Sequence, residues 1–255
     1  MIKTLVWVTI LCITTTLAYT PIAYGSDEQA SSGGENASNP LSKSTNTDLQ
    51  IKYYDLDGDS ERIDYAIDGS FMLSSKIKVK YELHYWDTDI TGQDEDDFES
   101  AHLKVIYFPK EGKIGSWKYR LAGGLEWIYD FDNTDKGIGS GSDIMSPFAG
   151  IALSPGKGLM LIPLVQHYTE YDGPDYNTTA FRVIALQSLP DQWWAKADFK
   201  IPFDWENDNQ IPATAELQIG KMISSNFGLY LDGLFGLGND RPYDYGVGLG
   251  IRFKY

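Results

Sequence analysis

The sequence is short of cysteine, of basic residues and of long hydrophobic runs, and each shortage excludes a class of protein. Its one cysteine, Cys12, permits no disulfide framework and no cysteine metal site within the chain. Lys and Arg number 21 against 36 Asp and Glu, a formal charge of −15. Nucleic-acid binding is therefore excluded, because it needs a basic surface. The mean hydropathy of −0.30 excludes a polytopic helical membrane protein but permits a β-barrel, whose alternating strands average to a polar score.

The N-terminus predicts export. Lys3 is followed by the apolar run 5–18, and small residues occupy Ala23 and Gly25. A charged start, a short apolar stretch and a small-residue boundary are typical of a secretory signal peptide, which we place at residues 1–25. An N-terminal membrane anchor is the alternative, but the run is shorter than the ~20 apolar residues that a spanning helix needs.

The next segment, residues 26–47, is rich in Ser, Asn and Gly and has almost no large apolar residues. A segment of this composition cannot bury enough apolar surface to fold on its own. We therefore expect a flexible periplasmic tail over 26–47, followed by one domain over 48–255.

From residue 48 onward the sequence alternates with a period of two. The C-terminal segment shows it clearly: aromatic and aliphatic residues occupy every odd position from Tyr243 to Tyr255, while Gly, Asp, Arg and Lys occupy the even positions. Strand side chains alternate between faces, so each such run predicts a strand with one apolar face and one polar face. Twelve runs lie between turn signals: 48–55, 61–73, 77–87, 99–109, 117–131, 144–154, 159–171, 177–189, 193–205, 210–222, 227–238 and 243–255.

Three of these runs are irregular. The runs 144–154, 159–171 and 177–189 carry apolar residues on both faces, and Pro163 and Pro202 stand in the middle of strands. A proline removes a ladder hydrogen bond, so bulges or register shifts are expected in this region.

The connections between runs alternate between short turns and long acidic loops, such as 87–99 and 130–143. An even number of strands with this alternation predicts an all-β fold, a twelve-stranded antiparallel transmembrane β-barrel with up-and-down meander topology. A secreted β-sandwich or small propeller is the alternative. Aromatic residues at both ends of the apolar stripes, such as Trp193 and Trp205, favour lipid contact, because they form interfacial girdles. The aromatic C-terminus, Tyr255, resembles the signal by which outer-membrane barrels are recognised for insertion.

Four segments resemble a widespread Gram-negative family of outer-membrane β-barrels described as transporters or as phenol-degradation (meta-pathway) proteins. They are GIGSGSDIMSPFAGIALSP (137–155), LIPLVQHYTEYDGPDYN (161–177), LPDQWWAKADFKIPFDWEND (189–208) and GLGNDRPYDYGVGLGIRFKY (236–255). The resemblance implies a barrel that moves small molecules, with aromatic or apolar compounds as expected solutes. It implies no catalytic residues.

With the short turns in the periplasm, the polar faces of the strands line the lumen. Basic residues, Lys254 among them, then lie in the periplasmic half, and Asp64, Asp130, Asp204 and Asp244 lie near the outer mouth. Charged rings of this kind select the solutes that enter a pore; alternatively, the charges pair across a filled lumen and plug it. The predicted pore-lining or binding residues are Lys78, Lys80, Glu82, His84, Lys118, Arg120, Glu126, Gln166, His167, Lys196, Asp198, Lys200, Glu216 and Arg252.

Two other motifs give weaker predictions. His167 and Thr169 are the nearest match to the His-x-Ser-Asn-Gly strand of outer-membrane phospholipases, but the serine and the Asn-Gly pair are missing, so we expect no enzyme. Asp55, Asp57 and Asp59 have the spacing of a calcium loop without its final glutamate, and a solvated turn is the favoured interpretation. The glycine-rich stretch 137–141 lies outside any βαβ unit, so it is expected to form a mobile loop at the rim.

Together these patterns predict an exported protein of the bacterial outer membrane, a passive channel or transporter for small molecules without a cofactor. The expected partners are outer-membrane lipid and lipopolysaccharide, the assembly machinery through the C-terminal strand, and a small-molecule solute. The rival functions are an outer-membrane enzyme acting on lipid and a structural barrel whose acidic surface loops bind Ca²⁺ or Mg²⁺.

Overall fold

The structure, a computed structural model, describes residues 36–255. The predicted signal peptide and residues 26–35 of the predicted tail lie outside the described residues. The strands are β1 (Asn46–Asp55), β2 (Glu61–Ser74), β3 (Ile77–Thr88), β4 (Glu95–Tyr107), β5 (Glu111–Ile114), β6 (Trp117–Asp130), β7 (Asp143–Gly156), β8 (Leu159–Asp172), β9 (Asn177–Ser188), β10 (Trp193–Asp204), β11 (Ala213–Met222), β12 (Phe227–Leu237) and β13 (Tyr245–Lys254). Two short 3₁₀ turns, η1 (Thr134–Lys136) and η2 (Pro190–Gln192), complete the described elements. Within this part of the chain, no helix has the length and apolar character needed to cross a membrane.

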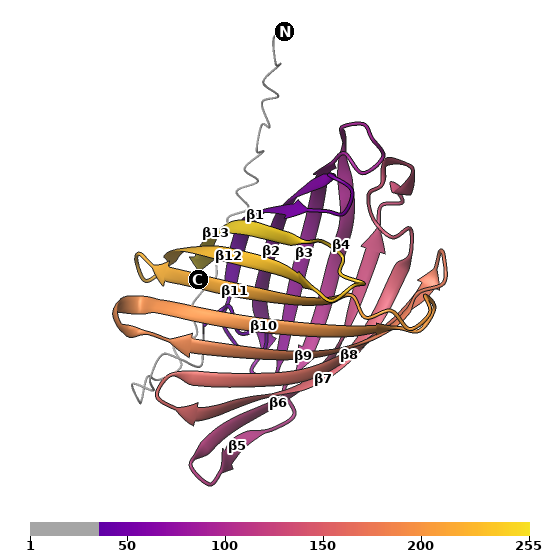
Figure 1. The fold of residues 1–255 in the computed structure, drawn as a ribbon. Helices are drawn as coiled ribbons and strands as arrows, with labels where there is room; N and C mark the ends of the chain where they lie inside the picture. The colour runs from indigo at the N-terminus through magenta and orange to yellow at the C-terminus, as the bar shows by residue number, and fades with distance from the viewer. Residues whose placement is uncertain (1–35) are drawn as a thin grey trace. The chain divides into compact units, whose positions relative to one another are not determined.

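The strands form one closed antiparallel sheet in chain order (Figure 1). The ring closes where β1 pairs with β13, from Asn46 opposite Lys254 to Asp55 opposite Tyr245. Full closure leaves no exposed strand edge, which is the condition for a sheet to span lipid. The predicted all-β, twelve-stranded antiparallel barrel with meander topology is confirmed.

The fourth strand of the barrel is built from two segments. Both β4 and β5 pair with β6, β4 along residues 123–130 and β5 along residues 117–120. They are one barrel strand interrupted at residues 108–110, where Pro109 cannot donate a ladder hydrogen bond. The predicted runs 99–109 and 117–131 leave residues 110–116 as a short turn; this is wrong, because residues 111–114 form β5 and only Gly115 and Ser116 separate it from β6.

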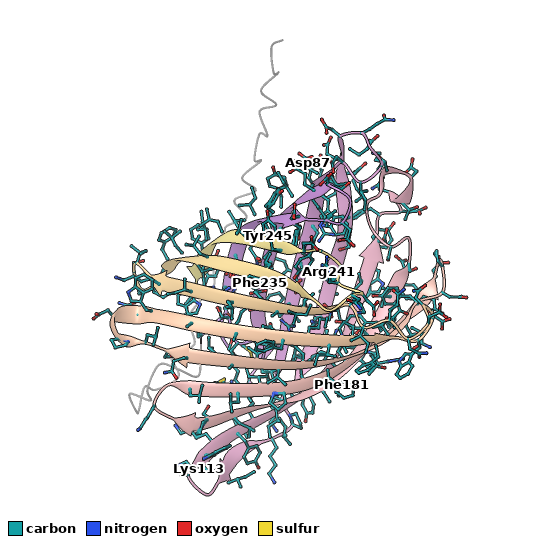
Figure 2. All side chains as sticks on the ribbon, viewed as in Figure 1. Asp87, Lys113, Phe181, Phe235, Arg241 and Tyr245 are labelled. Carbon is teal, nitrogen blue, oxygen red and sulfur yellow. The ribbon has the colours of Figure 1, made fainter. Side chains whose placement is uncertain are left out.

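The two ends of the barrel differ. The connections 56–60, 89–94, 131–142, 173–176, 205–212 and 238–244 lie at one end, which we call the loop end. The connections 75–76, 115–116, 157–158, 189–192 and 223–226 lie at the other, the short-turn end. Figure 2 labels Asp87 and Arg241 toward the loop end and Lys113 at the short-turn end.

The alternation of the sequence sorts side chains to the two faces of the wall. Large apolar side chains point outward, including Phe181, Phe235 and Tyr245 (Figure 2), which are 53%, 42% and 50% exposed. Their strand neighbours point inward, where Asp48 and Arg252 are buried. The outward apolar band suits lipid, and the charged residues are confined to the interior.

Irregular pairing occurs in part of the predicted region and also outside it, between Met72 and Ser74 in the β2–β3 ladder and between His84 and Tyr85 in the β3–β4 ladder. The β7–β8 ladder shifts register between Asp143 and Ile144 and again between Leu153 and Gly156, as expected. The β9–β10 ladder is regular from Trp194 to Asp204, so the expected irregularity at Pro202 is wrong.

The short-turn half of the interior is an apolar core. This core forms because the inward faces of the irregular strands β7–β9 are also apolar. At this level the barrel is therefore filled by packed side chains and not by water. The buried side chains of this cluster are Leu41, Ile106, Phe108, Ala122, Ala152, Met160, Ile162, Ile184, Leu186, Trp194 and Tyr230.

Leu41 belongs to this core because residues 36–45 lie inside the barrel. We call this segment the plug. Asn39, Leu41 and Ser42 are fully buried, and Thr47 already pairs within β1. The predicted flexible tail is therefore wrong for residues 36–47. A polar lumen supplies partners for Ser and Asn side chains, so this segment folds without an apolar surface of its own.

Gly250 in the barrel wall leaves space for the side chain of Tyr230, which reaches the plug region. A Cβ at Gly250 would overlap the ring of Tyr230, whereas a Cβ at Gly233 would have no neighbour closer than 3.4 Å. We expect Gly250→Ala to lower the free energy of unfolding by about 2 kcal/mol through overpacking, and Gly233→Ala to change it little. Denaturant titration in detergent micelles, followed by the gel mobility of unboiled protein, measures both. Equal stability of the two variants would contradict the close packing.

Candidate functional site

A cavity of about 460 Å³ lies in the lumen, above the plug. The inward faces of strands from all around the ring line it, and acidic and basic side chains contribute in equal number. The basic residues are Lys52, Lys78, Lys80, Lys104, Arg182, Lys196, Lys200 and Arg252, and the acidic residues are Asp48, Asp68, Glu82, Glu99, Glu126, Asp130, Glu216 and Asp232.

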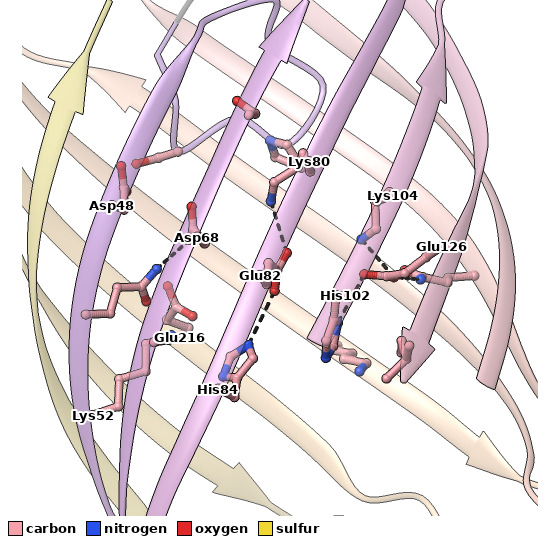
Figure 3. Close-up of a pocket in the computed structure, with 18 of the residues that line it drawn as sticks. Asp48, Lys52, Asp68, Lys80, Glu82, His84, His102, Lys104, Glu126 and Glu216 are labelled. Atoms are coloured by element: carbon pink, nitrogen blue, oxygen red, sulfur yellow. Dashed lines mark hydrogen bonds and ion pairs between the residues drawn. The ribbon is translucent and has the colours of Figure 1, made fainter. Parts of the chain in front are cut away.

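The sheet register places side chains of like charge directly opposite one another. Lys80 of β3 faces Lys104 of β4, and Asp68 of β2 faces Glu82 of β3. Such pairs repel, and a group of opposite charge lies nearby, either two residues along the same strand or directly opposite on the other neighbouring strand. Lys80 Nζ lies 3.3 Å from Glu82 Oε1, and Lys104 Nζ lies 2.9 Å from Glu126 Oε2 (Figure 3).

Two histidines join these pairs into a continuous polar chain. His84 Nδ1 lies 3.1 Å from Asp64 Oδ1, and its Nε2 lies 3.6 Å from Glu82 Oε2. His102 Nδ1 lies 3.4 Å from Glu126 Oε1, and the two imidazole centroids are 5.3 Å apart. Figure 3 shows the His84 ring beside Glu82 of β3 and the His102 ring beside Glu126 of β6.

The opposite wall repeats this arrangement on β9–β11. Lys196 Nζ lies 2.5 Å from Glu216 Oε1, and Arg182 Nε donates to Asp198 Oδ1 at 2.7 Å. All of these pairs join residues of one strand or of neighbouring strands. These charges therefore neutralise each other along the wall and not across the lumen, and a cavity remains between them.

A buried ion pair anchors the plug beneath the cavity. Arg252 Nε donates to Asp48 Oδ2 at 3.0 Å, and Arg252 Nη1 donates to Ser38 Oγ at 2.9 Å. Ser38 Oγ in turn donates to Gln218 Oε1 at 2.5 Å. Tyr230, which packs over Gly250, donates to Asp48 Oδ2 at 3.1 Å. The plug is thus tied to the wall through side chains of β1, β11 and β13.

Further contacts hold the plug at the short-turn end. Lys78 Nζ donates to the carbonyl oxygen of Ser42 at 2.9 Å, and Arg120 Nη1 donates to that of Leu41 at 3.1 Å. The Leu41 side chain is 1% exposed, within the apolar core. The plug therefore closes the lumen at the short-turn end.

The glycine-rich stretch 137–141 is folded rather than a mobile rim loop. Asp130 Oδ2 accepts hydrogen bonds from the backbone N–H groups of Ser140 and Gly141, at 2.7 and 3.1 Å, and Ile138 is fully buried. Gly139 has a φ of 80°, and a Cβ there would lie 2.6 Å from the Asp130 carboxylate. Since Asp130 and Ser140 both line the cavity, this loop borders its loop end.

Most of the predicted pore-lining residues lie on the cavity, and four do not. Asp198 is buried beside Arg182, Lys118 is exposed on the β5–β6 hairpin, and Arg120 lies against the plug. His167 faces outward. The residues on the cavity are Lys78, Lys80, Glu82, His84, Glu126, Gln166, Lys196, Lys200, Glu216 and Arg252.

His167 is misplaced because Gln166 and His167 are consecutive, and consecutive strand residues face opposite sides. Gln166 points inward and donates to Glu126. His167 Nδ1 lies 3.0 Å from Thr179 Oγ1, which also accepts from Trp205 Nε1 at 3.0 Å. Among the described contacts, Thr169 does not approach His167 and no acidic or amide side chain orients its ring, so a lipase-like triad is not assembled.

Several cavity residues were not predicted, although the same alternation marks them. His102 and Lys104 occupy even positions of β4 and alternate with the odd positions Leu103, Val105 and Tyr107, which are exposed on the outer face. Lys52, Asp68, Tyr168, Arg182 and Asp232 have the same relation to their neighbours and line the cavity.

The remaining predicted acidic residues have structural partners at the loop end. Asp57 lies 3.5 Å from Arg241, which also pairs with Asp244, and Asp204 accepts from the backbone N–H of Glu206 at 3.1 Å. Over residues 36–255, no three His, Cys, Asp or Glu side chains converge to hold a metal ion. The candidate loop at Asp55, Asp57 and Asp59 is therefore not assembled as a metal site.

Comparison with known proteins shows the fold. No family model matches the sequence, and no curated protein matches it significantly. Among solved structures, the NanC porin is similar with a TM-score of 0.61 at 10% identity, over 82% of this chain and 98% of that one. An outer-membrane channel from Pseudomonas putida F1 has a TM-score of 0.62 at 8% identity, over 89% and 100%. An outer-membrane phospholipase from Salmonella typhi has 0.52 at 12% identity, over 88% and 98%. What this chain shares with these structures is the antiparallel β-barrel fold.

The seating of the plug can be followed with single cysteines. The chain's one cysteine lies in the predicted signal peptide, so Ser42→Cys gives a unique thiol at a fully buried position. We expect a maleimide to label it far more slowly than Ser225→Cys in the exposed β11–β12 turn. Adding Leu41→Ala removes about 2 kcal/mol of apolar burial and should speed labelling at position 42 by roughly tenfold or more. Rapid labelling at position 42 without that change would contradict a seated plug.

Proposed function

We propose that the protein is a channel of the bacterial outer membrane that passes small, water-soluble solutes through its lumen. The observation that carries this proposal is the charged cavity enclosed by a wall that is apolar outside. A structural barrel without a transport role would need no hydrated cavity and could fill its lumen with packed side chains. The similarity to porins supports the same function.

The lining favours polar or charged solutes over the apolar compounds that the family resemblance implies. About half of the residues that line the cavity are acidic or basic, such as Glu82, Lys104 and Glu216, and charged groups of this kind are strongly hydrated in an open lumen. An apolar solute would displace that water without replacing its hydrogen bonds. A solute that carries charge or hydroxyl groups exchanges partners with the wall at little cost.

The plug makes this channel closed at rest. Residues 36–45 fill the short-turn end, and passage requires them to move. Only noncovalent contacts hold residues 36–45 against the inside of the wall, and Leu41 is the one large apolar side chain that they add to the core. Local release of such a segment requires less free energy than opening the sheet, so the proposed gate is the plug and the wall stays rigid.

The outer surface suggests the remaining partners. We propose that the acidic loop end faces the cell exterior, where Ca²⁺ or Mg²⁺ bridges its carboxylates to lipopolysaccharide. The strand β13 is proposed to engage the assembly machinery through its outward apolar positions, among them Phe253. We propose no enzymatic role, because the His167–Thr179 pair has no orienting third group among the described contacts.

Conductance in planar bilayers tests the channel and its gate together. We expect the intact protein to give small or infrequent openings, and deletion of residues 36–44 to give steady openings of severalfold larger conductance. Ser225→Ala, in an exposed turn, should behave as the intact protein. If the deletion variant inserts as a barrel but stays silent and its liposomes exclude amino acids and sugars, the channel function is wrong.

A further inference from the structure

Lys200 differs from the other basic residues of the cavity. Arg182, Lys196 and Arg252 each pair with a carboxylate of a neighbouring strand, as Lys104 also does, and Lys80 pairs with a carboxylate of its own strand. In the described part of the chain, Lys200 has no direct ion pair and no hydrogen bond; its ammonium lies 5.0 Å from the ring centroid of Tyr168. Its N–H donors are therefore available to a ligand.

The register increases the positive charge at this point. Lys200 of β10 lies directly opposite Arg182 of β9 on one side and opposite Thr214 of β11 on the other. Lys52, another cavity lysine without an ion pair, lies opposite Asp64. Two cations side by side on adjacent strands repel, and only Arg182 has a compensating carboxylate, Asp198. A bound anion would remove that repulsion.

The surroundings of Lys200 suit an organic anion. Tyr168 and Tyr176 line the same cavity and carry hydroxyl groups that donate hydrogen bonds. Ile128 and Ile144, which lie opposite each other on β6 and β7, add apolar surface to the lining. A few polar groups beside an apolar surface are the usual composition of a small-molecule site.

The part of the wall formed by β1, β2 and β3 disfavours a bound anion. Asp48, Asp68 and Glu82 form a row of acids across β1, β2 and β3, and a carboxylate near this row would be repelled. Within the described residues, the cavity thus favours a negative charge near β9–β10 over one near the acidic row of β1–β3.

We propose that Lys200, with Arg182 and the hydroxyls of Tyr168 and Tyr176, forms a binding subsite for the carboxylate of a small organic acid. The apolar part of the acid lies against Ile128 and Ile144. This inference rests on the proposed passage of solutes through the lumen and specifies their class. Charge-assisted hydrogen bonds to Lys200 and Arg182 supply the affinity, and the apolar surface distinguishes organic acids from inorganic anions.

Equilibrium binding to the intact protein in detergent tests the subsite. Titration calorimetry with benzoate, benzyl alcohol and inorganic phosphate separates the effect of charge from that of the apolar body. We expect saturable benzoate binding, with benzyl alcohol and phosphate each weaker by about tenfold or more, since each lacks one of the two interactions.

Matched variants locate the site. Lys200→Gln should weaken benzoate binding by about tenfold or more, and Lys200→Arg should retain it. Lys196→Gln removes a lysine of the same strand and face whose charge is already paired with Glu216, and it should change benzoate binding much less. Unchanged gel mobility before boiling shows that each variant is a folded barrel.

Three results would overturn the subsite: benzoate binding that does not saturate, equal affinity for benzoate and phosphate, or equal loss in the Lys200→Gln and Lys196→Gln variants. Binding is measured without conduction. A silent barrel that binds benzoate through Lys200 would refute the channel and keep the subsite, whereas a conducting barrel without this binding would refute the subsite alone.

Discussion

The closed, antiparallel ladder between β1 and β13 is the constraint on which the rest of the structure depends. A sheet that faces lipid must pair every backbone donor and acceptor within itself, so it cannot leave an edge. Once the barrel is closed, each strand side chain faces either the lipid or the lumen. Every charged side chain in the membrane-spanning part must then point inward, and the interior becomes crowded with ionised groups whatever the function of the protein.

Nearby groups of opposite charge neutralise the ionised groups that crowd the interior. Charges of like sign face each other across strand pairs, as at Lys80 and Lys104 or at Asp68 and Glu82, and groups of the opposite sign lie on the same strand or on the next strand of the wall. Neutralisation along the wall keeps the charges from collapsing across the lumen, and the cavity persists for that reason. Binding specificity can then arise from an exception to the pattern, and Lys200 is such an exception.

The sequence predicts the wall well because the period of two is a direct consequence of strand geometry. The strand predicted at 193–205 is observed as Trp193–Asp204, and Glu126 points inward as its alternation indicates. His167 could have been assigned correctly, since the inward placement of Gln166 already excludes it. The plug could not be predicted. Its Ser- and Asn-rich composition is typical of disorder, and only the polar interior of a barrel formed by distant residues gives it partners.

The Asp48–Arg252 pair has a consequence for the order in which the molecule assembles. These residues are direct neighbours across the β1–β13 junction and 204 positions apart in the chain, and the same guanidinium holds Ser38 of the plug. A contact between the two ends of a chain is among the last to form during folding, because its loop-closure entropy is large. Closing the barrel and seating the plug are therefore coupled steps, because Arg252 of the last strand both pairs with Asp48 of the first strand and binds Ser38 of the plug.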